Sequence, residues 1–270
     1  MNTQQNNQTL NQSKNEPIKL SLPGENEYFT QEAYKTLRTN IQFCGKKIKV
    51  IAMTSVNENE GKTTISLHVG KSFAELGKRV LVIDGDMRKS VAAGRNTSAD
   101  NPNGLSELLT GLKTLEECIY NVADTTMDVI FSGPYPPNPV ELLNGETFAK
   151  LIDDARLTYD YIIIDTPPLG YVIDAAVVAT KCDGVIMVLG SSKVHYKQAK
   201  ELVEQIQKSG AKMLGVVRNH RRKNEKGYYY SNKGYYRRSY KKYYRYGRYG
   251  GHSSNHGKTV ATEKKADTAK

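Results

Sequence analysis

The sequence predicts an α/β fold in which helices cover both faces of a doubly wound, mostly parallel sheet. Short runs rich in Val, Ile and Leu alternate with helical segments from residue 49 onward, a rhythm typical of strand–helix–strand units joined by right-handed crossovers. The runs are almost continuously apolar, as expected of strands whose two faces are both buried. In such sheets, ligands bind beyond the carboxyl ends of the strands. The predicted strands are 50–53 (VIAM), 80–84 (VLVID), 127–131 (MDVIF), 161–165 (YIIID), 184–189 (GVIMVL) and 213–217 (MLGVV).

The segments before and after the sheet are assigned from composition. Residues 1–25 are rich in Asn, Gln and Ser and predict a disordered lead, because they cannot bury enough apolar surface to offset chain entropy. Residues 26–47 predict one amphipathic helix, which precedes a main domain at 48–220. Leu, Ile and Val are absent from 218–258, so residues 221–270 are predicted to form a disordered basic tail. The apolar positions of the helix, which recur every four residues, are Ala33, Leu37 and Ile41.

Neither the hydropathy nor the cysteines point to a membrane-spanning or secreted protein. No stretch approaches the roughly 18 consecutive apolar residues that span a bilayer, and the N-terminal segment has no apolar signal region. These observations predict a cytoplasmic protein. The three cysteines, Cys44, Cys118 and Cys182, are widely separated, which is typical of reduced packing residues rather than of a disulfide framework or a zinc site.

A phosphate-binding loop is predicted between the first strand and the helix after it. The segment 53–64 reads MTSVNENEGKTT, and in such loops backbone N–H groups and a helix N-terminus cradle phosphates. Lys62 would reach the β- and γ-phosphates of ATP, and the hydroxyl of Thr63 would hold Mg²⁺. The chain has Val56 where the motif G-x-x-x-x-G-K-[ST] expects Gly, so a chance Gly-Lys-Thr at the start of a helix is the alternative for this motif alone. The residues predicted to bind the nucleotide are Asn57, Glu58, Asn59, Glu60, Gly61, Lys62, Thr63 and Thr64.

Carboxylates follow two further strands at the same edge of the sheet. Asp84 ends the strand 80–84 and is followed by Asp86, and Asp165 ends the strand 161–165. Mg²⁺ prefers oxygen ligands and commonly keeps several waters, so these side chains suit a site beside the phosphates. Any one of them alone could instead be a helix cap or a turn residue. The convergence of three strand ends favours a P-loop NTPase that binds ATP with Mg²⁺.

Four segments are informative when taken together: EGKTT at 60–64, VLVIDGDMR at 80–88, SGPYPPNPVELL at 132–143 and IIIDTPP at 162–168. In this combination they resemble the bacterial tyrosine kinases of capsule and exopolysaccharide synthesis. The resemblance extends over residues 27–249. It implies a P-loop NTPase fold with the deviant Walker motifs of MinD-like ATPases and the activity of an ATP-dependent protein-tyrosine kinase. It also implies that the enzyme regulates polysaccharide polymerisation and export.

The resemblance implies roles for individual residues of the site. Lys62 and Thr63 would bind nucleotide and Mg²⁺, and Asp84 would accept the proton of the incoming tyrosine hydroxyl. Asp86 and Asp165 would support Mg²⁺, and a permuted assignment of the three carboxylates is the alternative. Catalysis would then consist mostly of positioning and charge neutralisation. The catalytic residues are thus predicted to be Lys62, Asp84, Asp86 and Asp165, and the metal-binding residues Thr63, Asp86 and Asp165.

The chain departs from the family pattern in two places. Glu58 and Asn59 stand where the family commonly carries Pro-Gly. Asn is the best replacement for Gly at a positive φ, whereas the carboxylate of Glu58 predicts weaker nucleotide binding or dependence on a partner. The family's oligomerisation motif E-x-x-R-x-x-R appears as Glu32, Lys35 and Arg38. The resemblance implies a homo-oligomeric ring, although Lys35 cannot reproduce a bidentate Arg contact.

The tail carries a dense cluster of tyrosines among basic residues. Ten of the 18 tyrosines lie in 228–249, and 226–251 contains eight Lys or Arg residues and no Asp or Glu. Because most of the excess positive charge lies here, the main domain gives little support for nucleic-acid binding. The resemblance implies that the cluster is phosphorylated in trans. The predicted phosphoacceptors are Tyr228, Tyr229, Tyr230, Tyr235, Tyr236, Tyr240, Tyr243, Tyr244, Tyr246 and Tyr249.

The basic tail and the resemblance suggest several partners. Interleaved aromatic and basic residues are also typical of single-stranded nucleic-acid binders, and cations near an anionic leaflet contribute about 1 kcal/mol each, which favours the inner membrane surface. The resemblance implies a transmembrane adaptor of the polysaccharide co-polymerase type that activates the kinase, a cognate tyrosine phosphatase, and recruitment of the cytoplasmic protein to the inner face of the cell membrane.

Two alternative functions remain open. A partition or positioning ATPase of the MinD/ParA kind would share the fold, but it would carry a Lys early in the P-loop, where this chain has Val56 and Asn57, and no tyrosine cluster. A regulatory scaffold would bind nucleotide poorly because of Glu58 and Asn59. Nucleotide binding and phosphotyrosine formation distinguish the three functions.

Overall fold

The computed structural model describes residues 13–89, 92, 98, 101–190 and 196–219. The chain divides into two units, residues 1–221 and residues 222–270. All of the described residues belong to the first unit. Among them, no helix is both long and apolar enough to cross a membrane.

A seven-stranded sheet forms the centre of the first unit, with the strand order β3-β4-β2-β5-β1-β6-β7. Every neighbouring pair is parallel except β3 and β4, which are antiparallel. The six predicted strands are all present, which confirms the doubly wound, mostly parallel sheet. The short edge strand β3 was not predicted. The strands are β1 (Val50–Ser55), β2 (Val80–Asp84), β3 (Ile119–Asn121), β4 (Met127–Ile130), β5 (Tyr161–Asp165), β6 (Gly184–Gly190) and β7 (Met213–Asn219).

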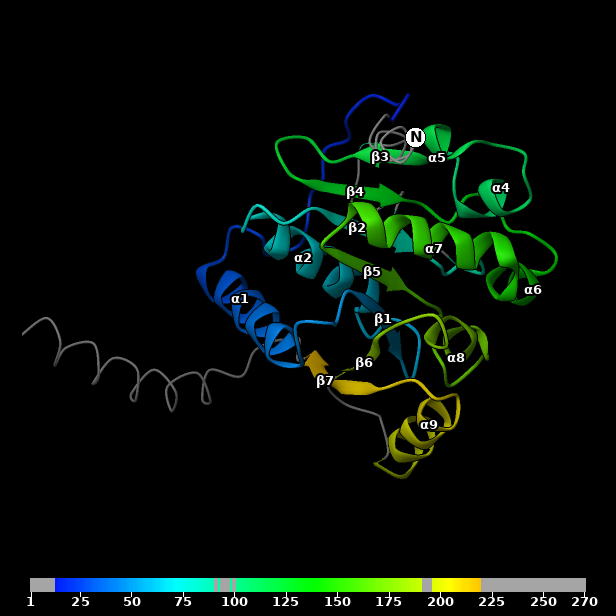
Figure 1. Cartoon of the computed structure of the whole chain (residues 1–270). Helices are drawn as coiled ribbons and strands as arrows, with labels where there is room; N and C mark the ends of the chain where they lie inside the picture. Colours follow the sequence, from blue (N-terminus) through cyan, green and yellow to red (C-terminus); the bar gives the residue numbers. More distant parts are fainter. Residues whose placement is uncertain (1–12, 90–91, 93–97, 99–100, 191–195, 220–270) are drawn as a thin grey trace, which may run out of the picture. The chain divides into compact units, whose positions relative to one another are not determined.

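Helices cover both faces of this sheet (Figure 1). On one face, α1, α2 and the lead segment pack over a core that contains Ile51 and Ile163. On the other face, α7, α8 and α9 pack over a second core that contains Ala52 and Ile162. Because consecutive residues of one strand enter opposite cores, both faces of the central strands are buried, as predicted. The helices are α1 (Tyr28–Phe43), α2 (Lys62–Ala74), α4 (Leu105–Leu109), α5 (Leu115–Cys118), α6 (Pro139–Asn144), α7 (Glu146–Thr158), α8 (Asp174–Ala179) and α9 (Tyr196–Lys208).

The lead is ordered over residues 13–25, so the prediction of disorder is wrong there. Ile18 forms a parallel bridge with Val122 beside β3. Its N–H donates to the carbonyl of Asn121 at 2.9 Å, and its carbonyl accepts from the N–H of Ala123 at 2.9 Å. Ile18 and Leu22 are each 4% exposed. Two buried side chains and the free backbone groups of an edge strand hold this segment, although its average composition is polar. Residues 1–12 lie outside the described residues.

Truncation of Ile18 should reveal the contribution of this lead segment to stability. We expect Ile18→Ala to lower the free energy of unfolding by about 2 kcal/mol, because a buried aliphatic side chain is removed. Urea unfolding followed by circular dichroism measures the change. Lys19→Ala is the matched control, since Lys19 is exposed. A loss for Ile18→Ala no larger than that for the control would show that the segment is not packed on the sheet edge in solution.

The three cysteines are free, as their spacing predicted. Cys118 is buried, whereas Cys44 and Cys182 are half-buried. Burial raises the pKa of the Cys118 thiol to about 12, so this side chain stays protonated at neutral pH and acts as a packing residue.

Candidate nucleotide and catalytic site

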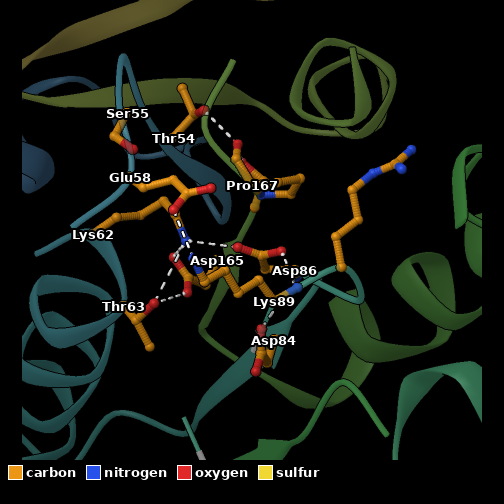
Figure 2. Close-up of polar contacts among 12 residues, drawn as sticks. Thr54, Ser55, Glu58, Lys62, Thr63, Asp84, Asp86, Lys89, Asp165 and Pro167 are labelled. Carbon is orange, nitrogen blue, oxygen red and sulfur yellow. Dashed lines mark hydrogen bonds and ion pairs between the residues drawn. The ribbon is translucent and has the colours of Figure 1, made fainter. Parts of the chain in front are cut away.

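The register of the central strands brings the predicted site residues together. β5 lies between β2 and β1, and Asp165 pairs with Asp84 on one side and with Met53 on the other. Met53 lies two residues before the end of β1, and the P-loop follows that strand. The carboxyl ends of three strands therefore converge on one place, as Figure 2 shows.

The P-loop spans residues 56–61, between β1 and α2. Two of its residues have a positive φ, which is 60° at Asn59 and 85° at Gly61. The value at Asn59 confirms that this position needs a residue that tolerates the left-handed region. A Cβ at Gly61 would also lie 2.1 Å from Nδ2 of Asn219, so only glycine fits there.

Substitutions at Asn59 should separate the backbone requirement from the side chain. We expect Asn59→Val to lower the free energy of unfolding by about 1–2 kcal/mol, because a β-branched residue is strained at a positive φ. Asn59→Gly permits the same backbone and should stay within about 0.5 kcal/mol of the natural chain. Thermal and urea unfolding of both variants tests this expectation. An equal loss in the two variants would show that the Asn side chain, and not the backbone angle, is required.

The buried carboxylate of Glu60 stabilises the P-loop through hydrogen bonds within the loop. Its Oε2 accepts hydrogen bonds from the N–H groups of Val56 and Asn57, both at 3.0 Å, and its Oε1 accepts from the side-chain amide of Asn57 at 3.3 Å. Glu60 is only 8% exposed, and Val56 is fully buried in the core. The position where the motif expects Gly thus carries a core side chain, and the Glu60 carboxylate satisfies the loop's first two N–H groups. We therefore assign the Glu60 side chain to the loop itself rather than to the nucleotide.

Asp165 is the centre of a buried polar cluster that contains Lys62. The ammonium of Lys62 lies 2.9 Å from Oδ1 of Asp165 and 3.8 Å from Oδ2 of Asp86. The hydroxyls of Thr63 and Ser66 also donate to the Asp165 carboxylate. Asp165 is 1% exposed and Lys62 is 6% exposed. The predicted P-loop lysine and hydroxyl therefore lie in direct contact with the carboxylate of Asp165, and Thr64 is half-buried on the same helical turn.

The acidic loop after β2 lies against the same cluster. The N–H of Gly85 donates to the carbonyl of Asp165 at 2.7 Å, and a Cβ at Gly85 would lie 2.9 Å from that oxygen. This close approach requires glycine between the two carboxylates. Asp84 Oδ1 accepts from the N–H of Asp86 at 3.1 Å. Burial raises the pKa of Asp86, and the nearby Lys62 charge acts in the opposite direction.

Two further interactions at the site were not predicted. Arg88 makes a bidentate contact with Asp174 at the start of α8, with distances of 2.9 and 3.2 Å, and Asp174 is 1% exposed. The side-chain amide of Asn219, at the end of β7, donates to the carbonyl of Glu60 at 2.8 Å. Arg88 falls within the segment VLVIDGDMR, so the motif already drew attention to it. Nothing in the sequence connects Asn219 to the P-loop, because that contact depends on strand order.

The remaining predicted residues lie elsewhere. Glu32 and Lys35 form an ion pair of 2.9 Å within α1, and the side chains are 46% and 44% exposed. Arg38 donates to the carbonyl and hydroxyl of Ser72 on α2. The three residues of the predicted oligomerisation motif therefore lie on one helix, α1, and their role in assembly stays a prediction. The ten predicted phosphoacceptor tyrosines lie outside the described residues.

Comparisons with known proteins find relatives over most of the chain. Residues 48–215 match the family model described as an AAA domain. The tyrosine-protein kinase CpsD of Streptococcus agalactiae is 40% identical over 190 residues, which cover 70% of this chain and 83% of the relative. The chain belongs to the bacterial tyrosine kinases.

A second relative and a solved structure are also similar to the kinase. The tyrosine-protein kinase YwqD of Bacillus subtilis is 34% identical over 212 residues, covering 76% of the kinase and 88% of the relative. The crystal structure of the chimerical protein CapA2B2 superposes with a TM-score of 0.69 at 34% identity, covering 74% of the kinase and 88% of that chain. The family and the P-loop fold together establish nucleotide binding for the kinase.

Proposed function

We propose that this kinase binds ATP with Mg²⁺ at the P-loop and transfers the γ-phosphoryl group to the tyrosine cluster at 228–249 of neighbouring copies. The observation that carries the proposal is the cluster at one sheet edge, in which Lys62 and Thr63 contact Asp165 and the Lys62 ammonium also lies 3.8 Å from Asp86. Carboxylate and hydroxyl oxygens are the ligands that Mg²⁺ prefers, so the donor set fits this ion. When bound, Mg²⁺ would neutralise charge on the phosphates.

Each side chain then has a definite task. Lys62 would move from the carboxylates to the β- and γ-phosphates, while Thr63, Asp86 and Asp165 would hold Mg²⁺. Asp84 would accept the proton of the tyrosine hydroxyl. The tyrosine oxygen forms a bond to the γ-phosphorus, the bond from that phosphorus to the bridging oxygen breaks, and ADP leaves. Asp84 suits the proton transfer because it lies beside the cluster and is 3% exposed.

The partners are proposed from the resemblance to the family. They are a transmembrane adaptor that activates the kinase at the inner membrane surface, a cognate tyrosine phosphatase, and further copies of the chain in a ring through Glu32, Lys35 and Arg38. The biological output would be control of capsular or exopolysaccharide polymerisation and export. The exposed Glu32–Lys35 pair supports the ring, because both side chains remain accessible to a neighbouring copy.

A phosphotyrosine assay tests the proposal. The purified full chain is incubated with Mg²⁺ and ATP, with and without the cytoplasmic segment of the candidate adaptor, and phosphotyrosine is detected with an antibody. A variant with Phe at all ten tail tyrosines should lose the signal but bind nucleotide as the natural chain does. ATP hydrolysis without phosphotyrosine would favour a positioning ATPase. Absence of nucleotide binding would favour a scaffold.

A further inference from the structure

An exposed ion pair joins the P-loop to the acidic loop after β2. The Nζ of Lys89 lies 2.8 Å from Oε2 of Glu58, and the side chains are 67% and 46% exposed. Figure 2 shows Glu58 on the same side of the P-loop as the Lys62 side chain. The pair is separate from the buried cluster around Asp165, and the roles derived above do not use it.

Glu58 places a negative charge in the loop that is proposed to bind the negatively charged phosphates of ATP. A carboxylate in a phosphate-binding loop repels a polyphosphate, and the repulsion grows in the reduced dielectric near a protein surface. The Glu60 carboxylate is turned inward onto loop N–H groups. Glu58 has no such role, since its carboxylate projects from the loop and meets the ammonium of Lys89.

The backbone of Lys89 is held in place by the acidic loop after β2. Its N–H donates to Oδ1 of Asp86 at 3.1 Å, and the preceding residue, Arg88, is fixed to Asp174. Lys89 therefore presents its ammonium to Glu58 of the P-loop from a restrained backbone. An ion pair this exposed contributes little to folding stability. Its main effect must be on the local electrostatic field.

Building on the proposed nucleotide site, we propose that Lys89 determines nucleotide affinity by neutralising Glu58. With Lys89 present, the P-loop tolerates the carboxylate and the phosphates meet a neutral pair. Without Lys89, Glu58 faces the phosphates as an uncompensated charge. The pair thus replaces the uncharged Pro-Gly of the family pattern with two opposite charges contributed by two different loops.

A double-mutant cycle on nucleotide binding tests the proposal. The probe is a fluorescent ADP analogue with Mg²⁺, titrated into the full chain at low salt. Lys89→Met should weaken binding about tenfold in the natural background. Glu58→Gln should bind at least as tightly as the natural chain, and Lys89→Met should change the affinity of Glu58→Gln less than about twofold. An equal loss in both backgrounds, or no loss in either, would overturn the proposal.

A matched control separates local from global charge effects. Lys113 pairs with Glu117 at 3.4 Å on α5, and both side chains are partly exposed. Lys113→Met removes the same charge away from the site and should leave nucleotide affinity unchanged. An equal loss for Lys113→Met would overturn the proposal, because the net charge alone would then set the affinity. Thermal unfolding of every variant confirms that each is folded.

The outcome is independent of the phosphotyrosine assay. Binding of the ADP analogue requires only the P-loop, so charge coupling without any phosphotyrosine would leave this inference standing and refute the proposed transfer to the tail. Phosphotyrosine formation without coupling between Glu58 and Lys89 would support the proposed transfer to the tail and refute this inference.

Discussion

Replacing Lys62 with Met should reduce phosphotyrosine formation at least about 100-fold. Lys62 is buried, and its ammonium lies 2.9 Å from the Asp165 carboxylate and 3.8 Å from the Asp86 carboxylate. No other lysine or arginine contact to the Asp165 carboxylate is found among the described residues. In the proposed mechanism Lys62 moves to the phosphates, so the variant would lack the cation that neutralises charge on the transferring group. Antibody detection of phosphotyrosine at saturating ATP measures the effect.

The same substitution should also destabilise the folded chain, in a pH-dependent way. Breaking a buried ion pair costs about 3 kcal/mol, because buried carboxylates are left unpaired. Burial already raises the pKa of Asp86 above 3.8, and loss of Lys62 should raise it further. The folded variant then binds a proton more readily than the unfolded chain does, so stability is lost as the pH rises through the folded pKa. The difference in unfolding free energy from the natural chain should therefore grow from about pH 4 to about pH 7.

Lys71→Met is the control for both effects. Lys71 lies on the same helix, α2, and pairs with Glu25 at 3.3 Å with both side chains partly exposed. This variant should retain phosphotyrosine formation and lose less than about 1 kcal/mol. Retention of activity by folded Lys62→Met would contradict the role of Lys62 at the phosphates.

Replacing Asp165 with Asn should have the second large effect. The carboxylate accepts from Lys62, Thr63 and Ser66 together, and an amide at this place would present a donor to groups that are themselves donors. We expect phosphotyrosine formation to fall at least about 100-fold. We also expect binding of the fluorescent ADP analogue to lose most of its dependence on Mg²⁺. Titrations with and without Mg²⁺ measure this second change.

Asp128→Asn separates the effect of Asp165 from that of any buried carboxylate. Asp128 is 8% exposed and accepts from the hydroxyl of Tyr159 at 2.7 Å and from the amide of Asn121 at 2.6 Å, away from the P-loop. This variant should lose stability but keep the Mg²⁺ dependence of nucleotide binding. If both variants lost that dependence equally, Asp165 would have no special place in the metal site.

Much of the fold follows from the hydrophobic pattern alone. Short apolar runs such as 161–165 that alternate with helical segments are typical of buried strands, and each one forms a strand of the central sheet. The strand β3 has three residues, which is too short for a periodic pattern. The prediction of disorder was wrong for residues 13–25, because an average composition does not reveal single residues that become buried. Ile18 and Leu22 bury there, although their neighbours are polar.

The site was predictable as a set of positions but not as a set of contacts. Motif spacing placed Lys62 at the start of a helix and Asp165 at a strand end, yet their distance of 2.9 Å depends on β5 lying beside β1. The inward turn of the Glu60 carboxylate depends on the path of a six-residue loop, for which the sequence has no periodic signal. The contact of Asn219 with Glu60 requires β7 to lie at the sheet edge beyond β6.

The ordered lead also matters for solubility. Residues 13–25 cover the outer side of β3, where Ile18 uses backbone groups of Asn121 and Ala123. A shortened chain that began at Glu27, as a prediction of disorder would recommend, would leave that edge with free N–H and C=O groups beside the apolar side chain of Val122. Open strand edges of this kind pair with other molecules, so the shortened chain should aggregate where the full chain stays dispersed.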